Sequence, residues 1–500
     1  MLTFQSVPSA APAVPSRGDW ALLCGITPLA VLIHGYHPTA EDAEIYLPGI
    51  LKLVHPSLFP RNAAFFQSHA GMTLFPNLIA DSIRITHLPD AVAVLGWHLV
   101  SIFLLLWGVW RIASLCFQEK RAVCCAVGLI TSLLTMPVAG TALYLMDPYL
   151  SPRSLSTPLA LHVVAWALER RYLRALVCVA AISVIHPLMS VFAIGWLAAY
   201  ILLSHWPDAL RHVRLRPVRE PGIILPLALF PAITPAYRQA LITHPYFLLN
   251  HWAWYEWLGI AGPFAILAGI AYLARRTGNS SLRLLCQSLM IFEGVFFTLA
   301  LFISMPGRFE RFSEIQPLRC LHLLYCVFLI LLGGLAAKYL PGHRTWQWAA
   351  FFVLLSAPMF FVQRQLFAAT PHVEILGMQS DNPWVRAFEW IRNNTPEDAF
   401  FAIDPEYARS ADEHGFRALA QRSMLADDGK DGGAVSMFPA LAEEWQRQLA
   451  EQSNWNRWGP ADLARLRRDR GVTWVVLSSP GLRELECPYR NQQLAVCQIP

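Results

Sequence analysis

The sequence predicts a polytopic α-helical membrane protein that carries a soluble α/β domain at its C-terminus. Of its 500 residues, 55% are hydrophobic and 15% are charged, and the mean hydropathy is +0.39. Soluble domains carry about 25% charged residues. The apolar residues form blocks of about 15–25 residues, the length of helix that crosses a bilayer. Eighteen Trp residues fit a protein with many anchors at the membrane interface.

The apolar blocks predict about eleven membrane spans. We expect them near residues 20–36, 91–113, 122–145, 155–168, 175–186, 188–204, 221–236, 257–274, 284–304, 318–337 and 346–362. The run 175–204 is too long for one simple span, and His186-Pro187 interrupts it. A single span over this run would place every later loop on the other side of the membrane, against the distribution of basic residues described below. The sequence therefore favours two short helices.

Basic residues in alternate loops indicate the orientation of these spans, because cytoplasmic loops carry an excess of Lys and Arg. The alternation predicts a cytoplasmic tail at 1–19 and a transmembrane domain at 20–365, with an outer loop at 37–90. Residues 366–500 then form a periplasmic domain. We therefore expect a multi-pass protein of the bacterial cytoplasmic (inner) membrane. The basic residues are Lys120, Arg121, Arg170, Arg171, Arg174, Arg211, Arg214, Arg216, Arg219, Arg275, Arg276, Arg283, Lys338 and Arg344.

The C-terminal segment alternates helix and strand patterns, which indicates a small α/β domain. Residues 400–404 and 472–479 are short apolar runs typical of strands. The segment before Gly471 has the pattern of a helix that ends at a glycine. Cys487 and Cys497 lie in a polar segment that resembles a closing hairpin. They form a candidate disulfide on the oxidising side, with two free thiols as the alternative.

Three carboxylates follow the first apolar block, within the stretch HGYHPTAEDAEIYLPG at residues 34–49. They are Glu41, Asp42 and Glu44. The simple interpretation is a helix start, with Thr39 as the cap and the acids near the positive helix end. The rest of the loop is apolar enough to lie on the membrane surface, particularly at 45–54 and 60–85. Acids in such a loop lie at the boundary between lipid and water.

This layout resembles the GT-C superfamily of membrane glycosyltransferases. The likeness consists of a cytoplasmic N-terminus, an acidic motif after the first span and interfacial helices in the first outer loop. Glu41-Asp42 precede Tyr46 as paired acids precede a tyrosine in several branches. The run 170–203 resembles the short paired helices of the superfamily. The segments EIQPLRCLHLLY, WIRNNTPEDAFF, GFRALAQRS and DDGK resemble a less characterised bacterial branch.

The resemblance implies transfer of a sugar from a polyprenyl-phosphate donor to a glycan, lipid or protein acceptor outside the cytoplasm. Asp42 is the predicted general base, with Glu41 and Glu44 in reserve. A leaving phosphate needs cations, and arginine matches its oxygens best. The predicted phosphate-binding residues on the outer face are Arg153, Arg308, Arg311 and Arg319. The alternative is a set of outer salt bridges, such as Arg153 with Asp147.

Further residues are candidates for the substrate cavity. They are Tyr46, His186, His244, Tyr255 and Glu256. His186 follows a helix break, and breaks within membranes are tolerated where they are buried or line a cavity. The simpler interpretation of His186 is a hydrogen bond at a helix end. For the aromatic residues around 244–256 the simpler interpretation is an interfacial belt.

No sequence motif identifies a cofactor. The chain has no Asp-x-Asp in the acidic loop, no P-loop and no HExxH, so no metal site is predicted, although a divalent metal stays open. Nothing indicates nucleic-acid binding, and the expected partners are lipids and a lipid-linked donor. Two other functions remain: a transporter or flippase of lipid-linked envelope precursors, and a non-catalytic assembly partner with a GT-C fold. The oligomeric state is not predicted.

Overall fold

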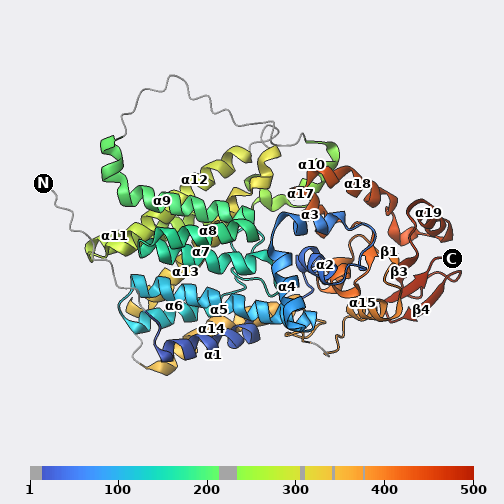
Figure 1. The fold of residues 1–500 in the computed structure, drawn as a ribbon, viewed down its shortest axis with the longest axis horizontal. Helices are drawn as coiled ribbons and strands as arrows, with labels where there is room; N and C mark the ends of the chain where they lie inside the picture. Colours follow the sequence, from blue (N-terminus) through green and yellow to red (C-terminus); the bar gives the residue numbers. More distant parts are fainter. Residues whose placement is uncertain (1–13, 213–232, 305–309, 340–343, 376–377) are drawn as a thin grey trace, which may run out of the picture.

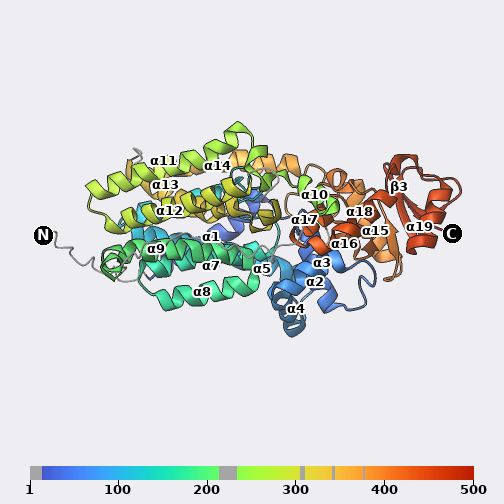
Figure 2. The same ribbon diagram turned by 90° about the horizontal axis from the view of Figure 1, so that it is seen from above.

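The protein is a bundle of long helices with a smaller region at one end that contains the first outer loop and a β-sheet (Figure 1). The computed structural model describes residues 14–212, 233–304, 310–339, 344–375 and 378–500. Turning the molecule shows that the long helices lie roughly parallel to the long axis, while α2, α3 and α4 lie beside the C-terminal elements (Figure 2).

The helices of the bundle overlap ten of the predicted spans. They are α1 (Arg17–His34), α5 (Asp90–Cys116), α6 (Lys120–Ser132), α7 (Pro152–Leu168), α8 (Tyr172–Ile185), α9 (Pro187–His212), α11 (Trp254–Arg276), α12 (Ser280–Ile303), α13 (Cys320–Tyr339) and α14 (Thr345–Leu366). The seventh predicted span, near 221–236, falls almost entirely outside the described residues. The predicted break at His186 is confirmed, because α8 ends one residue before it and α9 begins one residue after it.

The bundle has the properties of a membrane domain. In the described part of the chain, six helices are long and apolar enough to cross a membrane, namely α5, α9, α11, α12, α13 and α14. Large apolar side chains also face outward, for example Leu173 on α8 at 76% exposed and Leu354 on α14 at 72% exposed. Such exposure is unfavourable in water and favourable against lipid. The chain is therefore a helical membrane protein.

The third predicted span, 122–145, is wrong in its extent. Helix α6 ends at Ser132, and residues 133–151 continue as irregular backbone with a bridge between Pro137 and Tyr144. A helix of 13 residues is about 20 Å long and does not cross a bilayer core of about 30 Å by itself. Leu134, Val138 and Leu143 in the irregular segment are buried. Protein therefore surrounds this segment, as irregular backbone requires at membrane depth because lipid cannot pair its polar groups.

The outer loop contains the interfacial helices that the sequence predicted. They are α2 (Ala43–Val54), α3 (Ala64–Met72) and α4 (Phe75–Thr86). Ile50 of α2 packs with Phe75 and Ile79 of α4 and with Leu155 of α7, so the apolar face of the loop rests on the bundle. Another short helix, α10 (Pro235–Ile242), lies beside the C-terminal region.

The C-terminal region contains a five-stranded sheet with strand order β2-β1-β3-β5-β4. The strands are β1 (Phe400–Ala402), β2 (Ser423–Met424), β3 (Trp474–Ser478), β4 (Glu486–Arg490) and β5 (Leu494–Gln498). Its helices are α15 (Pro383–Asn394), α16 (Phe416–Ala420), α17 (Lys430–Met437), α18 (Ala442–Glu451) and α19 (Pro460–Arg470). Gly471, with φ of 72°, ends α19 as predicted.

Strands β4 and β5 form the predicted closing hairpin. The disulfide between Cys487 and Cys497 links its two strands, which confirms the predicted pair. The bond cross-links the edge strand β4 to its neighbour β5 and is expected only on the oxidising side of the membrane.

Candidate active site

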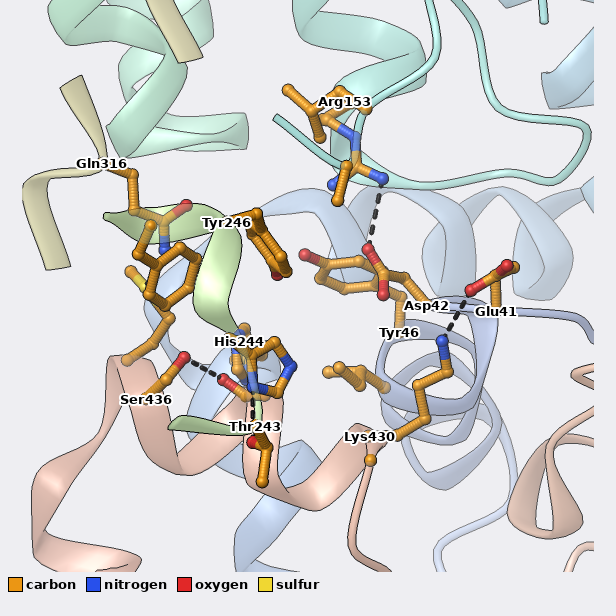
Figure 3. A pocket seen from close by; sticks show the side chains of 18 of the residues that line it. Glu41, Asp42, Tyr46, Arg153, Thr243, His244, Tyr246, Gln316, Lys430 and Ser436 are labelled. Carbon is orange, nitrogen blue, oxygen red and sulfur yellow. Dashed lines mark hydrogen bonds and ion pairs between the residues drawn. The ribbon is translucent and has the colours of Figure 1, made fainter. Parts of the chain in front are cut away.

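A cavity of about 370 Å³ lies where the helical bundle, the outer loop and the C-terminal region meet. Figure 3 shows that side chains from segments far apart in sequence point toward the same space. The outer loop provides Glu41, Asp42 and Tyr46, the start of α7 provides Arg153, and α17 provides Lys430. The cavity is therefore assembled by the whole fold.

Backbone hydrogen bonds fix the acidic loop on both sides. On one side, Tyr36 N–H donates to the His372 carbonyl at 3.0 Å in the linker after α14. On the other side, Glu41 N–H donates to the Glu413 carbonyl at 2.8 Å. Glu41 has φ of 54°, in the left-handed region, so the chain turns sharply just before Asp42. This segment thus lies between the linker and the C-terminal domain.

Asp42 is held by a buried arginine. Arg153 Nη2 lies 3.2 Å from Asp42 Oδ2 and 3.0 Å from Asp147 Oδ2. Burial raises the pKa of Asp42, but the charges of Arg153, Lys430 and Arg319 outweigh this effect and bring the pKa to about 2. Asp42 is therefore a carboxylate at neutral pH. The salt bridge considered for Arg153 and Asp147 is present, so Arg153 is not a free phosphate ligand.

Glu41 pairs with Lys430 across the cavity. Lys430 Nζ lies 2.6 Å from Glu41 Oε2, and the dashed lines of Figure 3 mark this pair and the Asp42–Arg153 pair. Lys430 begins α17, and its pKa is raised well above the usual value because the nearby carboxylates outweigh its burial. Sequence reasoning did not assign Lys430 a role in the site. The only signal was the DDGK segment.

Arg319 is the unpaired cation of the cavity. It ends η5 (Pro317–Arg319), the short turn that leads into α13, and it is half-buried. Its Nε is buried without a hydrogen-bond partner, and no ion pair to it is found among the described residues. An unpaired guanidinium in a partly desolvated site is unfavourable unless an anion binds there.

Uncharged histidines line the rest of the cavity. They are His69, His186 and His244. Burial lowers the pKa of His69 to about 4 and also lowers the pKa of His244. His244 Nδ1 lies 2.7 Å from the Thr243 hydroxyl, and His186 Nε2 is buried without a partner. Sequence reasoning selected His186 and His244 but missed His69.

Glu44, a predicted reserve base, does not line the cavity. Its carboxylate accepts hydrogen bonds from the backbone N–H groups of Arg417 and Ala418 at 2.9 and 2.8 Å. The Arg417 guanidinium lies 3.4 Å away and pairs with Asp431 at 2.8 Å. All three charged side chains are buried. Glu44 therefore joins the outer loop to the C-terminal domain, and this prediction of a catalytic role is corrected.

The remaining predicted residues lie elsewhere. Tyr255 is 62% exposed at the start of α11. Glu256 accepts a hydrogen bond from the Ala253 N–H at 2.7 Å, which caps the same helix. Neither lines the cavity, so the cavity role predicted for them is corrected. Arg308 and the side chain of Arg311 lie outside the described residues, so their predicted role is not tested.

A second cleft of about 530 Å³ adjoins the cavity on its C-terminal side. Pro405, Glu406 and Asp428 line both spaces, so the two are neighbours. The lining is rich in acids, amides and one indole, and includes Asp404, Gln452, Ser453, Asn454, Trp455 and Asn456. Gln452 Oε1 is buried without a hydrogen-bond partner.

Part of the chain matches a known family model. Residues 382–451 match the family model named Domain of unknown function (DUF6798). The matched segment runs from α15 to α18 and includes Lys430, which reaches the cavity, and Arg417, which pairs with Glu44. No curated protein matches the chain.

Proposed function

We propose that the protein is a membrane glycosyltransferase of the GT-C type, which moves a sugar from a polyprenyl-phosphate donor to an acceptor outside the cytoplasm. One observation carries the proposal. A fully ionised carboxylate, Asp42, and an unpaired guanidinium, Arg319, face one cavity where the outer loop meets the membrane helices. Sugar transfer from a lipid phosphate needs these two groups, a proton acceptor and an anion site.

In this proposal Arg319 binds the donor phosphate. The phosphate supplies the missing counter-charge, and charge-assisted hydrogen bonds to guanidinium are strong. Lys430 adds positive charge to the lining of the same cavity. The apolar residues of the lining, among them Met72, Leu188 and Phe247, provide surface for the first isoprene units of the lipid.

Asp42 accepts the proton of the acceptor group. The acceptor oxygen or nitrogen forms a bond to the anomeric carbon while the bond from that carbon to the phosphate oxygen breaks. The phosphate leaves with the electron pair, and its new charge is stabilised by Arg319. A carboxylate with a pKa of about 2 is a weak base, so it accepts the proton late, when the new bond has made the acceptor group acidic. Arg153, which also pairs with Asp147, holds Asp42 in place.

The second cleft supports an extended polar acceptor. Carbohydrate hydroxyls match a lining of carboxylates, amides and an indole, because each hydroxyl both donates and accepts hydrogen bonds. We propose that a glycan acceptor enters along this cleft and presents its end to Asp42.

The proposal also includes eleven spans, a cytoplasmic N-terminus and a periplasmic C-terminal domain in a bacterial inner membrane. The connections from α5 to α6, from α7 to α8 and from α11 to α12 lie at the end of the bundle away from the C-terminal region (Figure 1). Lys120, Arg171 and Arg276 belong to these connections in the sequence, which agrees with the positive-inside rule for this orientation. The disulfide in the C-terminal domain is supporting evidence, since such bonds persist in oxidising compartments.

The test is transfer of radiolabelled sugar from polyprenyl-phosphate donors, tried one sugar at a time, in membranes that contain the full chain. The variants are Asp42→Asn and a matched control, Asp90→Asn, which alters an acid of the same loop that pairs with His55 outside the cavity. We expect wild type and Asp90→Asn to transfer equally. Asp42→Asn should lose roughly 10²–10⁴-fold, the range for removal of a general base.

Three results would contradict parts of the proposal. Equal transfer by Asp42→Asn would exclude Asp42 as the base and direct attention to Glu41. Absence of transfer by wild type, together with movement of labelled lipid across reconstituted vesicles, would instead identify a flippase. Absence of both activities would favour the assembly-partner hypothesis.

A further inference from the structure

A compact cluster of His37, Glu374 and His414 lies outside the cavity. None of the three residues lines the proposed active site. They come from three separate parts of the chain: the segment after α1, the linker after α14 and the C-terminal domain. Isolated bridges between Tyr36 and Val373 and between Ala40 and His414 align these backbones.

The three side chains converge on a single point. Glu374 Oε1 lies 2.6 Å from His37 Nδ1 and 2.9 Å from His414 Nε2. One ligand atom from each residue lies within 4.8 Å of the others. Both histidine side chains are fully buried, whereas the Glu374 side chain is 17% exposed. The site is enclosed by protein and reachable on the Glu374 side.

The hydrogen bonds of His414 restrict its protonation. Its Nδ1 lies 3.0 Å from each of the carbonyl oxygens of Ala411 and Asp412. Carbonyl oxygens only accept hydrogen bonds, so Nδ1 carries a proton. Nε2 of His414 then faces the Glu374 carboxylate in one of two states. It carries a proton in an imidazolium cation, or it presents a lone pair in a neutral ring. Two lone pairs facing each other repel unless a cation lies between them.

The surroundings of His414 match those of a metal-binding histidine, whereas Nε2 of His37 is buried without a hydrogen-bond partner. Metal-binding histidines donate their second ring N–H to a carbonyl or carboxylate, which fixes the tautomer and aims the free lone pair at the metal. Two imidazole nitrogens and one carboxylate form a donor set that suits zinc and other first-row transition metals. Ca²⁺ and Mg²⁺ prefer sites made of oxygen alone.

We propose that His37, Glu374 and His414 bind one divalent transition-metal ion, with zinc as the best match. The ion joins the outer loop, the linker and the C-terminal domain, and a water on the exposed side of Glu374 completes its coordination. Glu41 and Asp42 follow His37 closely in sequence, so the metal positions the carboxylates of the cavity without contacting substrate. The proposal is independent of the glycosyltransferase function.

The test uses the purified full-length protein in detergent. The chain is stripped with a chelator, reloaded with Zn²⁺, desalted and analysed for metal by mass spectrometry. Co²⁺ is added in a parallel sample, because its visible spectrum reports bound nitrogen ligands and their geometry. We expect about one metal ion per chain and a lower melting temperature after chelation.

Variants identify the ligands. Glu374→Gln keeps the side-chain shape, and His414→Ala removes one nitrogen; both should abolish stoichiometric metal and the Co²⁺ spectrum. The matched control is His372→Ala, because His372 lies next to His37 but bonds to the Leu32 carbonyl instead. This control should bind metal as wild type does. Folded wild type that binds neither Zn²⁺ nor Co²⁺ would overturn the proposal and leave an imidazolium–carboxylate pair. Metal that persists in Glu374→Gln would be adventitious and would overturn it as well.

Discussion

Substitution of Arg319 by Gln should weaken donor binding without destabilising the protein. The buried Nε of Arg319 has no hydrogen-bond partner, and the nearby Asp42 carboxylate forms its ion pair with Arg153 instead. Removing a cation that has no ion-pair partner should change the stability of the ligand-free protein little, whereas removing one partner of a buried ion pair destabilises a protein strongly. We therefore expect an unchanged or raised melting temperature.

The loss of affinity follows from the contact that Arg319 would make. A hydrogen bond to a charged group contributes about 1.5–3 kcal/mol, and each 1.4 kcal/mol corresponds to about a tenfold change in the dissociation constant. Arg319→Gln should thus raise the dissociation constant for a polyprenyl phosphate by about 10–150-fold. Arg153 cannot compensate, because Asp42 and Asp147 already occupy it.

The assay is direct titration of a radiolabelled polyprenyl phosphate into the purified protein in detergent, with melting temperatures measured in parallel. Arg465→Gln is the matched control, because Arg465 is an exposed arginine on α19 that pairs with Asp462. The control should bind the lipid as wild type does. Affinity of Arg319→Gln equal to that of the control would refute the phosphate role. A marked fall in its melting temperature would show that Arg319 is structural.

Three further predictions concern stability and pH. Glu44→Ala leaves two buried N–H groups and part of Arg417 unpaired. It should therefore lower the free energy of unfolding by about 2–5 kcal/mol in denaturant titrations. The control is the exposed Glu443, whose substitution by Ala should change the free energy of unfolding by under about 0.5 kcal/mol. Because the pKa of Asp42 is lowered from 3.8 to about 2, its ionised form stabilises the fold above about pH 4, and this contribution is lost as the pH falls through the folded pKa. The rate of sugar transfer should therefore not fall through protonation of Asp42 at any pH above about 4. An inflection of the rate between about pH 5 and 7 that disappears in Asp42→Asn would contradict the assigned pKa. Cys487→Ser opens a link between residues separated by 10 positions and should lower unfolding free energy by about 2–3 kcal/mol; equal denaturation midpoints with and without reductant would contradict this.

The acidic loop shows what the sequence can and cannot predict about the site. Its place after α1 and the pairing of Glu41 with Asp42 are local features, and the cavity does contain both. Glu44 is two residues beyond Asp42, which on a helix corresponds to a turn of about 200°. The two carboxylates therefore point in different directions, and sequence proximity alone did not separate their roles.

Residues that reach the site through tertiary structure were harder to predict. Lys430 and His69 lie on polar or amphipathic segments that have ordinary surface patterns. Their approach to Asp42 depends on how the C-terminal domain and α3 dock. The same applies to His37, Glu374 and His414, because no metal-ligand spacing joins residues so far apart. By contrast, the hairpin disulfide and the helix end at Gly471 follow from short-range patterns and were predicted.

The junctions around the acidic loop favour an enzyme over a transporter. Glu41 pairs with Lys430, Glu44 binds α16 and Arg417, and the cluster at His37 connects the linker with the C-terminal domain. Alternating access requires one part of a transporter to rock against another around the bound substrate. Movement of the C-terminal domain against the outer loop and the linker would have to break and reform these three junctions. A rigid arrangement instead suits catalysis, because charges fixed before the reaction stabilise a leaving phosphate without further reorganisation.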